Sequence, residues 1–289
     1  MCALIAILHR VPGYPVVVGA NRDEEHSRLG LAPAVFRGKR IAVLCPRDRR
    51  AGGTWIGLNE KGLVGAITNR PAPSPDPRLR SRGLLLLDLV AQPTAALAVE
   101  WLRRDLKKSR YNPFNVLLAD EVGGSVAHVP KGTEEGIDLQ SLEAGAHLLT
   151  NLHDVDALSV DGISTVGDVV RVEDALENLK TFLGDHTPRG NHLFCRHGGD
   201  RGTLSSTMVA VSGGNLDATF FLHAEGPPCK TPFRDHSKLA RHLASAEDRE
   251  ATREFGGRFE EEAGSEEESL DGSGDRPRRS SGPRGRGGR

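Results

Sequence analysis

The order of strand-like and helix-like segments limits the folds that this chain can adopt. Short apolar runs rich in Val, Ile and Leu predict strands, and longer runs with apolar residues about one turn apart predict helices. A group of strands comes first, followed by two helices, further strands, one helix and two final strands. Because this order lacks regular strand–helix–strand alternation, it predicts an α+β fold of antiparallel sheets with helices grouped on the outer layers.

Pro, Gly and polar residues mark the ends of these segments. Pro12 and Gly13 separate the first two strands, which predicts a β-hairpin at the N-terminus. Gly62 supplies a positive φ in a predicted turn, and Ser81 is the predicted N-cap of the first helix. The predicted strands are Ala3–Leu8, Pro15–Ala20, Ile41–Cys45, Gly53–Leu58, Leu63–Thr68, Phe114–Ala119, Gly124–Val129, His147–Thr150, Ser205–Val211 and Ala218–His223, and the predicted helices are Gly83–Gln92, Thr94–Lys107 and Val169–Leu183.

The composition changes near the C-terminal end. Hydrophobic residues make up 37% of the chain, which is on the low side for a globular protein. Much of this deficit in hydrophobic residues lies beyond residue 243. Glu260–Glu262 and Glu266–Glu268 are acidic, and Arg276–Arg289 contains no apolar side chain. Such a segment buries too little surface to offset the entropy lost on ordering. We therefore predict a folded domain over residues 1–243 and a disordered tail over residues 244–289, first acidic and then rich in Arg and Gly.

Charge and cysteine content exclude several classes of protein. A formal net charge of −1 gives no general attraction to nucleic acid or anionic membranes, so no specific nucleic-acid partner is predicted. The short apolar run at the N-terminus lacks a preceding basic region, and no run approaches the roughly 20 residues that span a bilayer. Four scattered cysteines favour a reducing compartment. The sequence predicts a cytoplasmic protein without a transmembrane segment, and it leaves the oligomeric state open.

Cys2 is a candidate nucleophile because it becomes the first residue once Met1 is removed. Its free α-amino group, with a reference pKa of about 7.7–8.0, would then act as the general base for its own thiol. The alternative is an ordinary strand residue, since a cysteine at this position means little alone.

Asn21–Glu24 follows the second predicted strand, and the hairpin brings the end of that strand back towards Cys2. Arg22 would lower the thiol pKa through its fixed charge, and Asp23 would orient the α-ammonium. The alternative is a polar turn with weak surface ion pairs. Asn69, at another strand end, would donate its amide hydrogens to an oxyanion, and the alternative there is an Asx turn.

Other polar residues give weaker signals. His26 follows two glutamates, and His192 and His197 flank Cys195, where a zinc or haem role is conceivable. Neighbours in a turn rarely converge on one ion, so a solvated face and an ordinary loop are the favoured interpretations, and no metal site or cofactor is predicted. The Arg-Gly tail is interpreted as solvated, with weak RNA contact as the alternative.

Taken in order, these motifs resemble those of the NRDE family, also called the transport and Golgi organisation protein 2 family, which is named after the tetrapeptide at Asn21–Glu24. The resemblance runs from Met1 to His223. One departure is Asp200-Arg201, where the family often has an aromatic residue before Gly-Thr. The remaining matches are Gly52-Gly53-Thr54-Trp55, Thr68-Asn69, Ser81-Arg82-Gly83, Asn112-Pro113-Phe114-Asn115, Thr150-Asn151 and Gly202-Thr203-Leu204-Ser205-Ser206-Thr207.

The resemblance implies a four-layer αββα sandwich of the N-terminal-nucleophile (Ntn) hydrolase type, similar to choloylglycine hydrolases and penicillin V acylases. Those enzymes use a terminal Cys, an Arg and an Asp near the end of the second strand, and Asn residues for the oxyanion. By resemblance, Cys2, Arg22, Asp23, Asn69 and Asn151 take these roles.

Two functions follow from the resemblance. The first is an amidohydrolase or acyltransferase that acts on a small-molecule amide or acyl thioester through a Cys2 thioester. The second is a non-catalytic binding and trafficking protein for a hydrophobic ligand such as haem or acyl-CoA. Members of the family have been linked to secretory organisation, lipid and acyl-CoA metabolism, and haem trafficking, so both functions stay open.

Overall fold

The computed structural model describes residues 3–37, 41–190, 192–214 and 216–243, which form two antiparallel sheets. Sheet A has the strand order β10-β1-β2-β11-β12-β13, and sheet B contains β3 to β9 in chain order. The strands are β1 (Ala3–Val11), β2 (Tyr14–Glu25), β3 (Gly30–Arg37), β4 (Ala42–Asp48), β5 (Ile56–Asn59), β6 (Val64–Asn69), β7 (Phe114–Ala119), β8 (Gly124–Val129), β9 (Asp138–Leu142), β10 (Gly145–Thr150), β11 (Arg201–Val211), β12 (Phe220–Ala224) and β13 (Arg234–Asp235). The helices are α1 (Arg82–Val90), α2 (Ala95–Leu106), α3 (Val172–Leu183) and α4 (Ser237–Arg241), with a short 3-10 helix, η1 (Ile163–Thr165).

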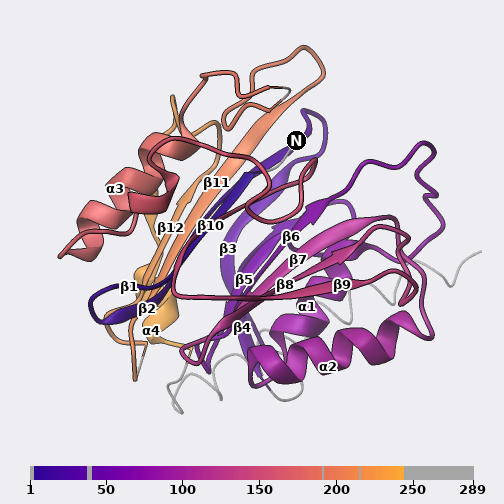
Figure 1. The fold of residues 1–289 in the computed structure, drawn as a ribbon, viewed down its shortest axis with the longest axis horizontal. Helices are drawn as coiled ribbons and strands as arrows, with labels where there is room; N and C mark the ends of the chain where they lie inside the picture. The colour runs from indigo at the N-terminus through magenta and orange to yellow at the C-terminus, as the bar shows by residue number, and fades with distance from the viewer. Residues whose placement is uncertain (1–2, 38–40, 191, 215, 244–289) are drawn as a thin grey trace, which may run out of the picture. The chain divides into compact units, whose positions relative to one another are not determined.

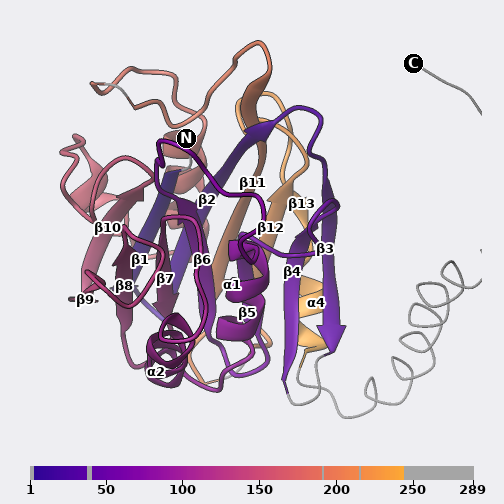
Figure 2. The same cartoon turned by 90° about the vertical axis from the view of Figure 1, so that its right-hand side faces the viewer.

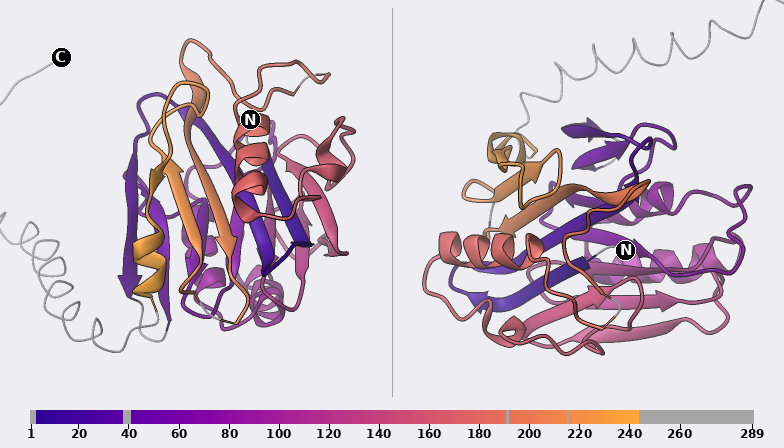
Figure 3. Two further views of the ribbon diagram at one scale, coloured as in Figure 1. Left: turned by 90° about the vertical axis from the view of Figure 1, so that its left-hand side faces the viewer. Right: turned by 90° about the horizontal axis from the view of Figure 1, so that it is seen from above.

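The two sheets stack face to face, and helices cover both outer faces (Figure 1). One apolar core fills the space between the sheets. A second core joins α1 and α2 to sheet B, and a third joins α3 to sheet A. Figure 3 shows α3 against the strands of sheet A. The layers therefore follow the order helix, sheet, sheet, helix, which confirms the predicted α+β fold with a four-layer αββα arrangement of antiparallel sheets.

Side chains along the N-terminal hairpin alternate between two cores. In β1, Leu4 and Leu8 belong to the core between the sheets, whereas Ile5 and Ile7 face α3. In β2, Val18 likewise points between the sheets. This period of two follows from the pleat of a strand, and it decides which way the polar residues at the end of β2 point.

The predicted turns and caps are confirmed. The hairpin forms with the register Leu4↔Ala20. Gly62 has a φ of +83°, and the Ser81 hydroxyl accepts a hydrogen bond from Gly83 N at 3.2 Å, which caps α1. The local signals of the sequence therefore correspond to real chain reversals and helix starts.

Several elements differ from the sequence-based expectation. β2 continues to Glu25, so Asn21–Glu24 lies within a strand and not in a turn beyond it. β3, β9 and β13 were not predicted, and neither was α4. α4 is a short helix (Figure 2). Its Ala240 belongs to the core between the sheets.

The structure bears on the predicted lack of a transmembrane segment, but it does not test the predicted tail or the predicted location. No helix in the described residues is both long and apolar enough to cross a membrane. The predicted tail over residues 244–289 lies outside the described residues, so the domain boundary stays a prediction, as does the cytoplasmic location.

Candidate functional site

The end of β2 pairs with β11 across a β-bulge. Arg22 lies opposite Ser205 and Asp23 opposite Thr203, so Leu204 is the extra residue on β11. Bulges of this kind redirect side chains and are frequent beside functional sites. All four residues of the tetrapeptide Asn21–Glu24 are at most 8% exposed. The four side chains therefore need partners inside the protein, and each has a different set.

Asn21 has a structural role. Its amide nitrogen donates hydrogen bonds to Leu183 O and Phe194 O, both at 2.8 Å. These carbonyls belong to the end of α3 and to the segment that leads into β11. Asn21 therefore fixes the backbone around the outer face of sheet A rather than facing a cleft.

Arg22 points the other way, towards sheet B. Its guanidinium carbon lies 4.5 Å from the centre of the Trp55 ring, and its Nη2 lies 3.8 Å from Asp48 Oδ2. The side chain is 6% exposed. Arg28 Nη2 approaches the same carboxylate oxygen to 2.7 Å. Burial raises the pKa of Asp48, but hydrogen bonding and charge from Arg28 outweigh it, so that the pKa lies below its usual value and Asp48 stays ionised.

Asp23 is held by β11. Thr203 Oγ1 donates a hydrogen bond to Asp23 Oδ1 at 2.7 Å. Burial raises the pKa of Asp23 above its usual value, and the hydrogen bond from Thr203 acts in the opposite direction. A proton is therefore easier to hold on this carboxyl group than in water, and perturbed pKa values of this kind are frequent at functional sites.

Glu24 joins two arginines at the rim of the same region. Its Oε2 accepts from Arg28 Nη1 at 3.1 Å, and its Oε1 accepts from Arg201 Nη2 at 2.9 Å. Arg201 is the residue that departs from the family pattern, and it also contacts Glu25 at 3.1 Å. The departure therefore supplies an ion-pair partner for the last residue of the tetrapeptide.

Two glycine motifs that are distant in sequence meet beside Arg22. A Cβ atom on Gly53 would lie 2.4 Å from the Gly83 carbonyl carbon, so the two backbones touch. Thr54 N also donates to Gly83 O at 3.0 Å. The paired glycines thus allow the loop before β5 to pack against the first turn of α1. This contact places Trp55 and the start of α1 on the same side of the molecule.

One buried amide joins the two sheets close to the predicted oxyanion residues. Asn115 on β7 donates to Thr68 Oγ1 at 3.2 Å and to Thr150 O at 3.0 Å. Thr68 and Thr150 directly precede Asn69 and Asn151. In addition, Thr150 pairs with Ala3, the first described residue of β1. The ends of β6 and β10 are therefore held beside the start of β1.

A cleft of about 420 Å³ collects most of these residues. It lies where the end of β2, the loop before β5, the end of β6 and the start of α1 come together. Most of its lining is polar or charged. The described lining residues are Arg22, Asp23, Glu24, Arg28, Asp48, Arg50, Ala51, Thr54, Trp55, Ile67, Asn69, Asp76, Pro77, Leu79, Arg80, Ser81, Arg82, Gly83 and Asn112.

The predicted site residues divide into three groups. Arg22, Asp23 and Asn69 line this one cleft. Asn151 does not belong to its described lining, and its Oδ1 is buried without a hydrogen-bond partner among the described residues. Cys2 lies outside the described residues, so the structure does not test its position.

Other residues of the site were not singled out by the sequence. Asp48 and Thr203 can be assigned to the site only from their contacts in the structure, Asp48 with Arg22 and Thr203 with Asp23. Trp55, Thr203 and Asn115 lie in segments that match the family, but position in a motif says nothing of contact. Asp48 lies outside those segments, and no local signal distinguishes it from the other acidic residues.

The family comparison covers two thirds of the chain. A sequence model of the family described as Transport and Golgi organisation 2 matches residues 1–195. The Transport and Golgi organization 2 homolog of Mus musculus is 33% identical over 111 residues, which cover 37% of this chain and 39% of the mouse protein. The Homo sapiens homolog is 32% identical with the same coverage. The aligned part is thus well under half of each relative.

Two solved structures with a similar chain trace are an amidase ortholog and a bile acid hydrolase. A Caenorhabditis elegans N-acylethanolamine-hydrolyzing acid amidase ortholog is 14% identical and covers 73% of this chain and 92% of its own, with a TM-score of 0.49. The C2A mutant of the conjugated bile acid hydrolase from Clostridium perfringens is 15% identical and covers 82% of this chain and 93% of its own, with a TM-score of 0.48.

Proposed function

Because the chain belongs to the Transport and Golgi organisation 2 family, we propose that it is a cysteine amidohydrolase or acyltransferase whose nucleophile is Cys2. The observation that supports this proposal is the common cleft. Arg22 and Asp23 from sheet A and Asn69 from sheet B line one cavity large enough for a small molecule. A binding protein without chemistry has no evident need to bury an arginine and an aspartate beside a partly buried asparagine around one space.

The proposed reaction uses the α-amino group of the mature chain as base. This amine takes the proton of the Cys2 thiol, and the thiolate attacks the carbonyl carbon of an amide. The C–N bond then breaks, and the leaving nitrogen receives the proton from the α-ammonium. The acyl group stays on sulfur as a thioester. Water, or an acceptor amine in a transfer reaction, attacks this thioester, and the thiol recovers its proton. An acyl-thioester substrate follows the same steps with a thiol as leaving group.

Three cleft residues have distinct roles in this scheme. Arg22 supplies a positive charge that favours the thiolate, although Asp48 balances part of that charge. Asp23 holds and orients the α-ammonium. The side-chain amide of Asn69 makes no hydrogen bond to a described residue, so its hydrogens are available to an oxyanion. In this scheme Asn151 is a second donor that lies outside the cleft lining.

The second candidate, a binding protein for haem or acyl-CoA, fits the cleft less well. Haem buries a wide apolar face, whereas arginines and carboxylates dominate this lining. The arginines favour a substrate that carries a carboxylate or another anionic group. We therefore expect a small acyl amide or acyl thioester with an anionic end as the substrate class.

Mass spectrometry of the intact protein tests the proposal directly. The mature chain is expected to begin at Cys2 and to gain the mass of the acyl group when incubated with small N-acyl amides and acyl thioesters. Cys2→Ala should abolish the adduct, and Asn69→Ala should slow its formation by roughly 100-fold, as for the loss of one oxyanion donor.

Cys45→Ala is the matched control. Burial raises the pKa of the Cys45 thiol to about 12, so it is not a nucleophile at neutral pH, and its removal should leave adduct formation unchanged. Retention of Met1 in the whole population would contradict the proposal. Saturable binding of a hydrophobic ligand without any adduct or turnover would favour the trafficking function instead.

A further inference from the structure

Two loops at the same end of sheet A bring four metal-ligand side chains together. The first loop, residues 184–200, connects α3 to β11 and carries His186, Cys195 and His197. The second loop, residues 225–233, connects β12 to β13 and carries Cys229. Both loops lie at the upper end of the domain in the left view of Figure 3. One potential ligand atom from each of the four residues lies within 4.8 Å of the others.

The distances between these atoms match the edges of a tetrahedral zinc site. Cys195 Sγ and Cys229 Sγ are 3.6 Å apart. His197 Nε2 lies 3.9 Å from Cys195 Sγ and 3.2 Å from Cys229 Sγ. Tetrahedral bonds of about 2.3 Å to sulfur and about 2.0 Å to nitrogen give edges of about 3.8 Å between sulfurs and about 3.5 Å between sulfur and nitrogen. These three distances therefore need shifts of only a few tenths of an ångström, and the ligand atom of His186 lies within 4.8 Å of the other three.

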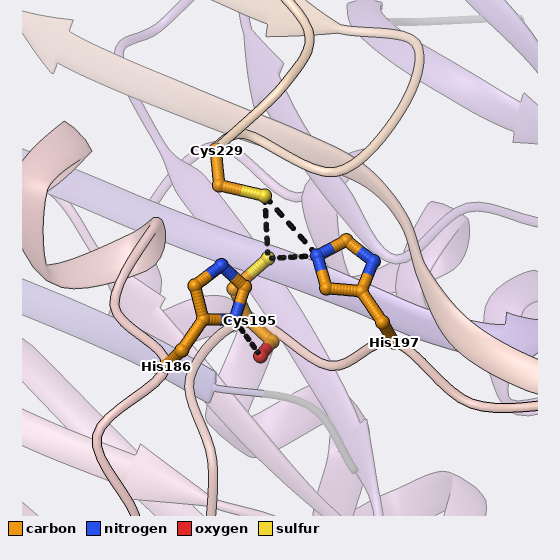
Figure 4. Close-up of side chains that lie close together, drawn as sticks. All are labelled: His186, Cys195, His197 and Cys229. Atoms are coloured by element: carbon orange, nitrogen blue, oxygen red, sulfur yellow. Dashed lines mark hydrogen bonds between the residues drawn. The ribbon is translucent and has the colours of Figure 1, made fainter.

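His186 shows the orientation that metal-bound histidines adopt. Its Nδ1 lies 3.1 Å from the carbonyl oxygen of Cys195. A carbonyl only accepts, so Nδ1 carries the proton and Nε2 keeps its lone pair. Figure 4 shows this second nitrogen on the side of the Cys195 sulfur. A backbone acceptor on the far nitrogen is the usual outer contact of a histidine that binds zinc.

We propose that His186, Cys195, His197 and Cys229 form a structural zinc site. Two thiolates and two imidazoles are a ligand set that suits zinc and does not suit magnesium, calcium or manganese. Four protein ligands leave no position for substrate, so the ion stabilises structure and performs no reaction. From the sequence, an ordinary loop was the favoured interpretation around Cys195. The spacing of the residues near Cys195 does not reveal that the folded chain brings His186 and Cys229 to the same place.

The zinc site would support the cleft through the residues beside Cys195. Phe194 O accepts the hydrogen bond from Asn21 at 2.8 Å. Arg196 O accepts from Thr203 N, and Thr203 Oγ1 accepts from Arg196 N, both at 2.9 Å. Thr203 in turn holds Asp23. An ion that fixes Cys195 would therefore also hold Phe194 and Arg196, which flank it and hydrogen-bond to Asn21 and Thr203. The zinc site itself does not depend on the proposed reaction.

A disulfide between Cys195 and Cys229 is the competing explanation. Both thiols are free, and their separation of 3.6 Å exceeds the bond length of about 2.05 Å. A disulfide would also not explain why His186 and His197 lie beside the two thiols. Direct measurement of zinc and of the thiols separates the two explanations.

The test is zinc binding by the full-length, tag-free chain purified under reducing conditions without oxygen. Elemental analysis should find one zinc ion per chain, and cobalt substitution should give the visible absorption of a tetrahedral thiolate site. Removal of zinc with a chelator should lower the Tm by about 5–10 °C, and added zinc should restore it. Cys229→Ser and His197→Gln should each weaken zinc binding by about 100-fold or more. Both residues are exposed, so these variants leave the core intact.

Two cysteine variants outside the cluster serve as controls. Cys45→Ala and Cys2→Ala should each keep one zinc ion with unchanged affinity. A zinc-free wild-type chain that does not take up zinc would overturn the proposal. Zinc lost from Cys2→Ala but kept by Cys229→Ser would also overturn it, because the ion would then belong to the N-terminus. A Cys195–Cys229 disulfide in the oxygen-free preparation would favour the competing explanation.

Discussion

The fold buries the carboxyl group of Asp23, and burial of this group costs free energy. Burial disfavours the charged form, which is why the pKa of Asp23 lies above its usual value despite the hydrogen bond from Thr203. Natural proteins tolerate such a cost at functional positions, and removing it commonly raises stability while it lowers function. Asp23 therefore offers a test of whether the end of β2 is optimised for folding or for chemistry.

We predict that Asp23→Asn raises stability at neutral pH. The variant keeps a side-chain oxygen that accepts from Thr203 Oγ1, but it carries no charge to bury. A raised pKa means that the folded wild type retains a proton that the unfolded chain has released. The wild-type free energy of unfolding therefore falls as the pH rises above about 3.9 and through the folded-state pKa. Each unit of upward shift corresponds to about 1.4 kcal/mol.

Urea unfolding of both proteins between about pH 4 and pH 8 measures this difference. The two free energies should converge at the acidic end and separate as the pH rises, with the variant more stable. Asp161→Asn, at an exposed position, is the control for removing a negative charge. A variant that is less stable than the wild type at pH 7 would show that positive neighbours, and not burial, dominate the environment of Asp23.

Some secondary-structure elements could be predicted from neighbouring residues, whereas others depend on residues that are distant in the sequence. The hairpin, the Gly62 turn and the Ser81 cap were predictable because each depends on neighbouring residues. β3 and β9 were not, since both lie at the edges of sheet B and lack alternating apolar residues. Asn21–Glu24 was expected after a strand because its residues are polar. The fold makes it part of a strand by supplying Arg28, Arg201 and Thr203 as partners from elsewhere.

The candidate site was predictable to the same extent. Family motifs identified Arg22, Asp23 and Asn69, which line one cleft. They did not identify Asp48, because its role depends on the approach of β4 to the end of β2 through the stacking of the two sheets. The four-residue cluster around Cys195 was missed for a related reason, since Cys229 lies on a separate loop. Sequence motifs indicate candidate residues, whereas the packing of distant segments decides which of them meet.

The Gly53–Gly83 contact yields a prediction about how the loop before β5 is joined to α1. Gly53→Ala should destabilise the protein by about 1–3 kcal/mol, because the new Cβ would lie 2.4 Å from the backbone of Gly83 and one segment must move. Thermal unfolding measures the loss. Gly123→Ala is the matched control, since a Cβ at that position meets nothing within 4 Å, and it should stay within about 1 kcal/mol of the wild type. Equal effects of the two substitutions would show that the backbone contact is unimportant.

At the scale of the whole molecule, α4 and the residues just after it are part of the hydrophobic core. Ala240 and Leu243 belong to the core between the sheets, and Leu243 is fully buried. The hydroxyl of Ser237, in the first turn of α4, also accepts a hydrogen bond from Phe221 N at 3.1 Å, which ties the helix to β12. The last residues before the predicted tail therefore contribute to the same core as the N-terminal hairpin.

We predict that two truncations only a few residues apart differ sharply in stability. Removal of residues 244–289 should change the Tm by less than about 2 °C, because the segment has too few apolar side chains to contribute to a core. Removal from Ser237 onward should lower the Tm by about 5–10 °C, because it exposes the core around Leu243. Leu243→Ala in the full chain isolates this contribution and should cost about 2–5 kcal/mol. Differential scanning calorimetry of the four proteins gives the answer, and a large loss on removing only residues 244–289 would show that the charged tail packs against the domain.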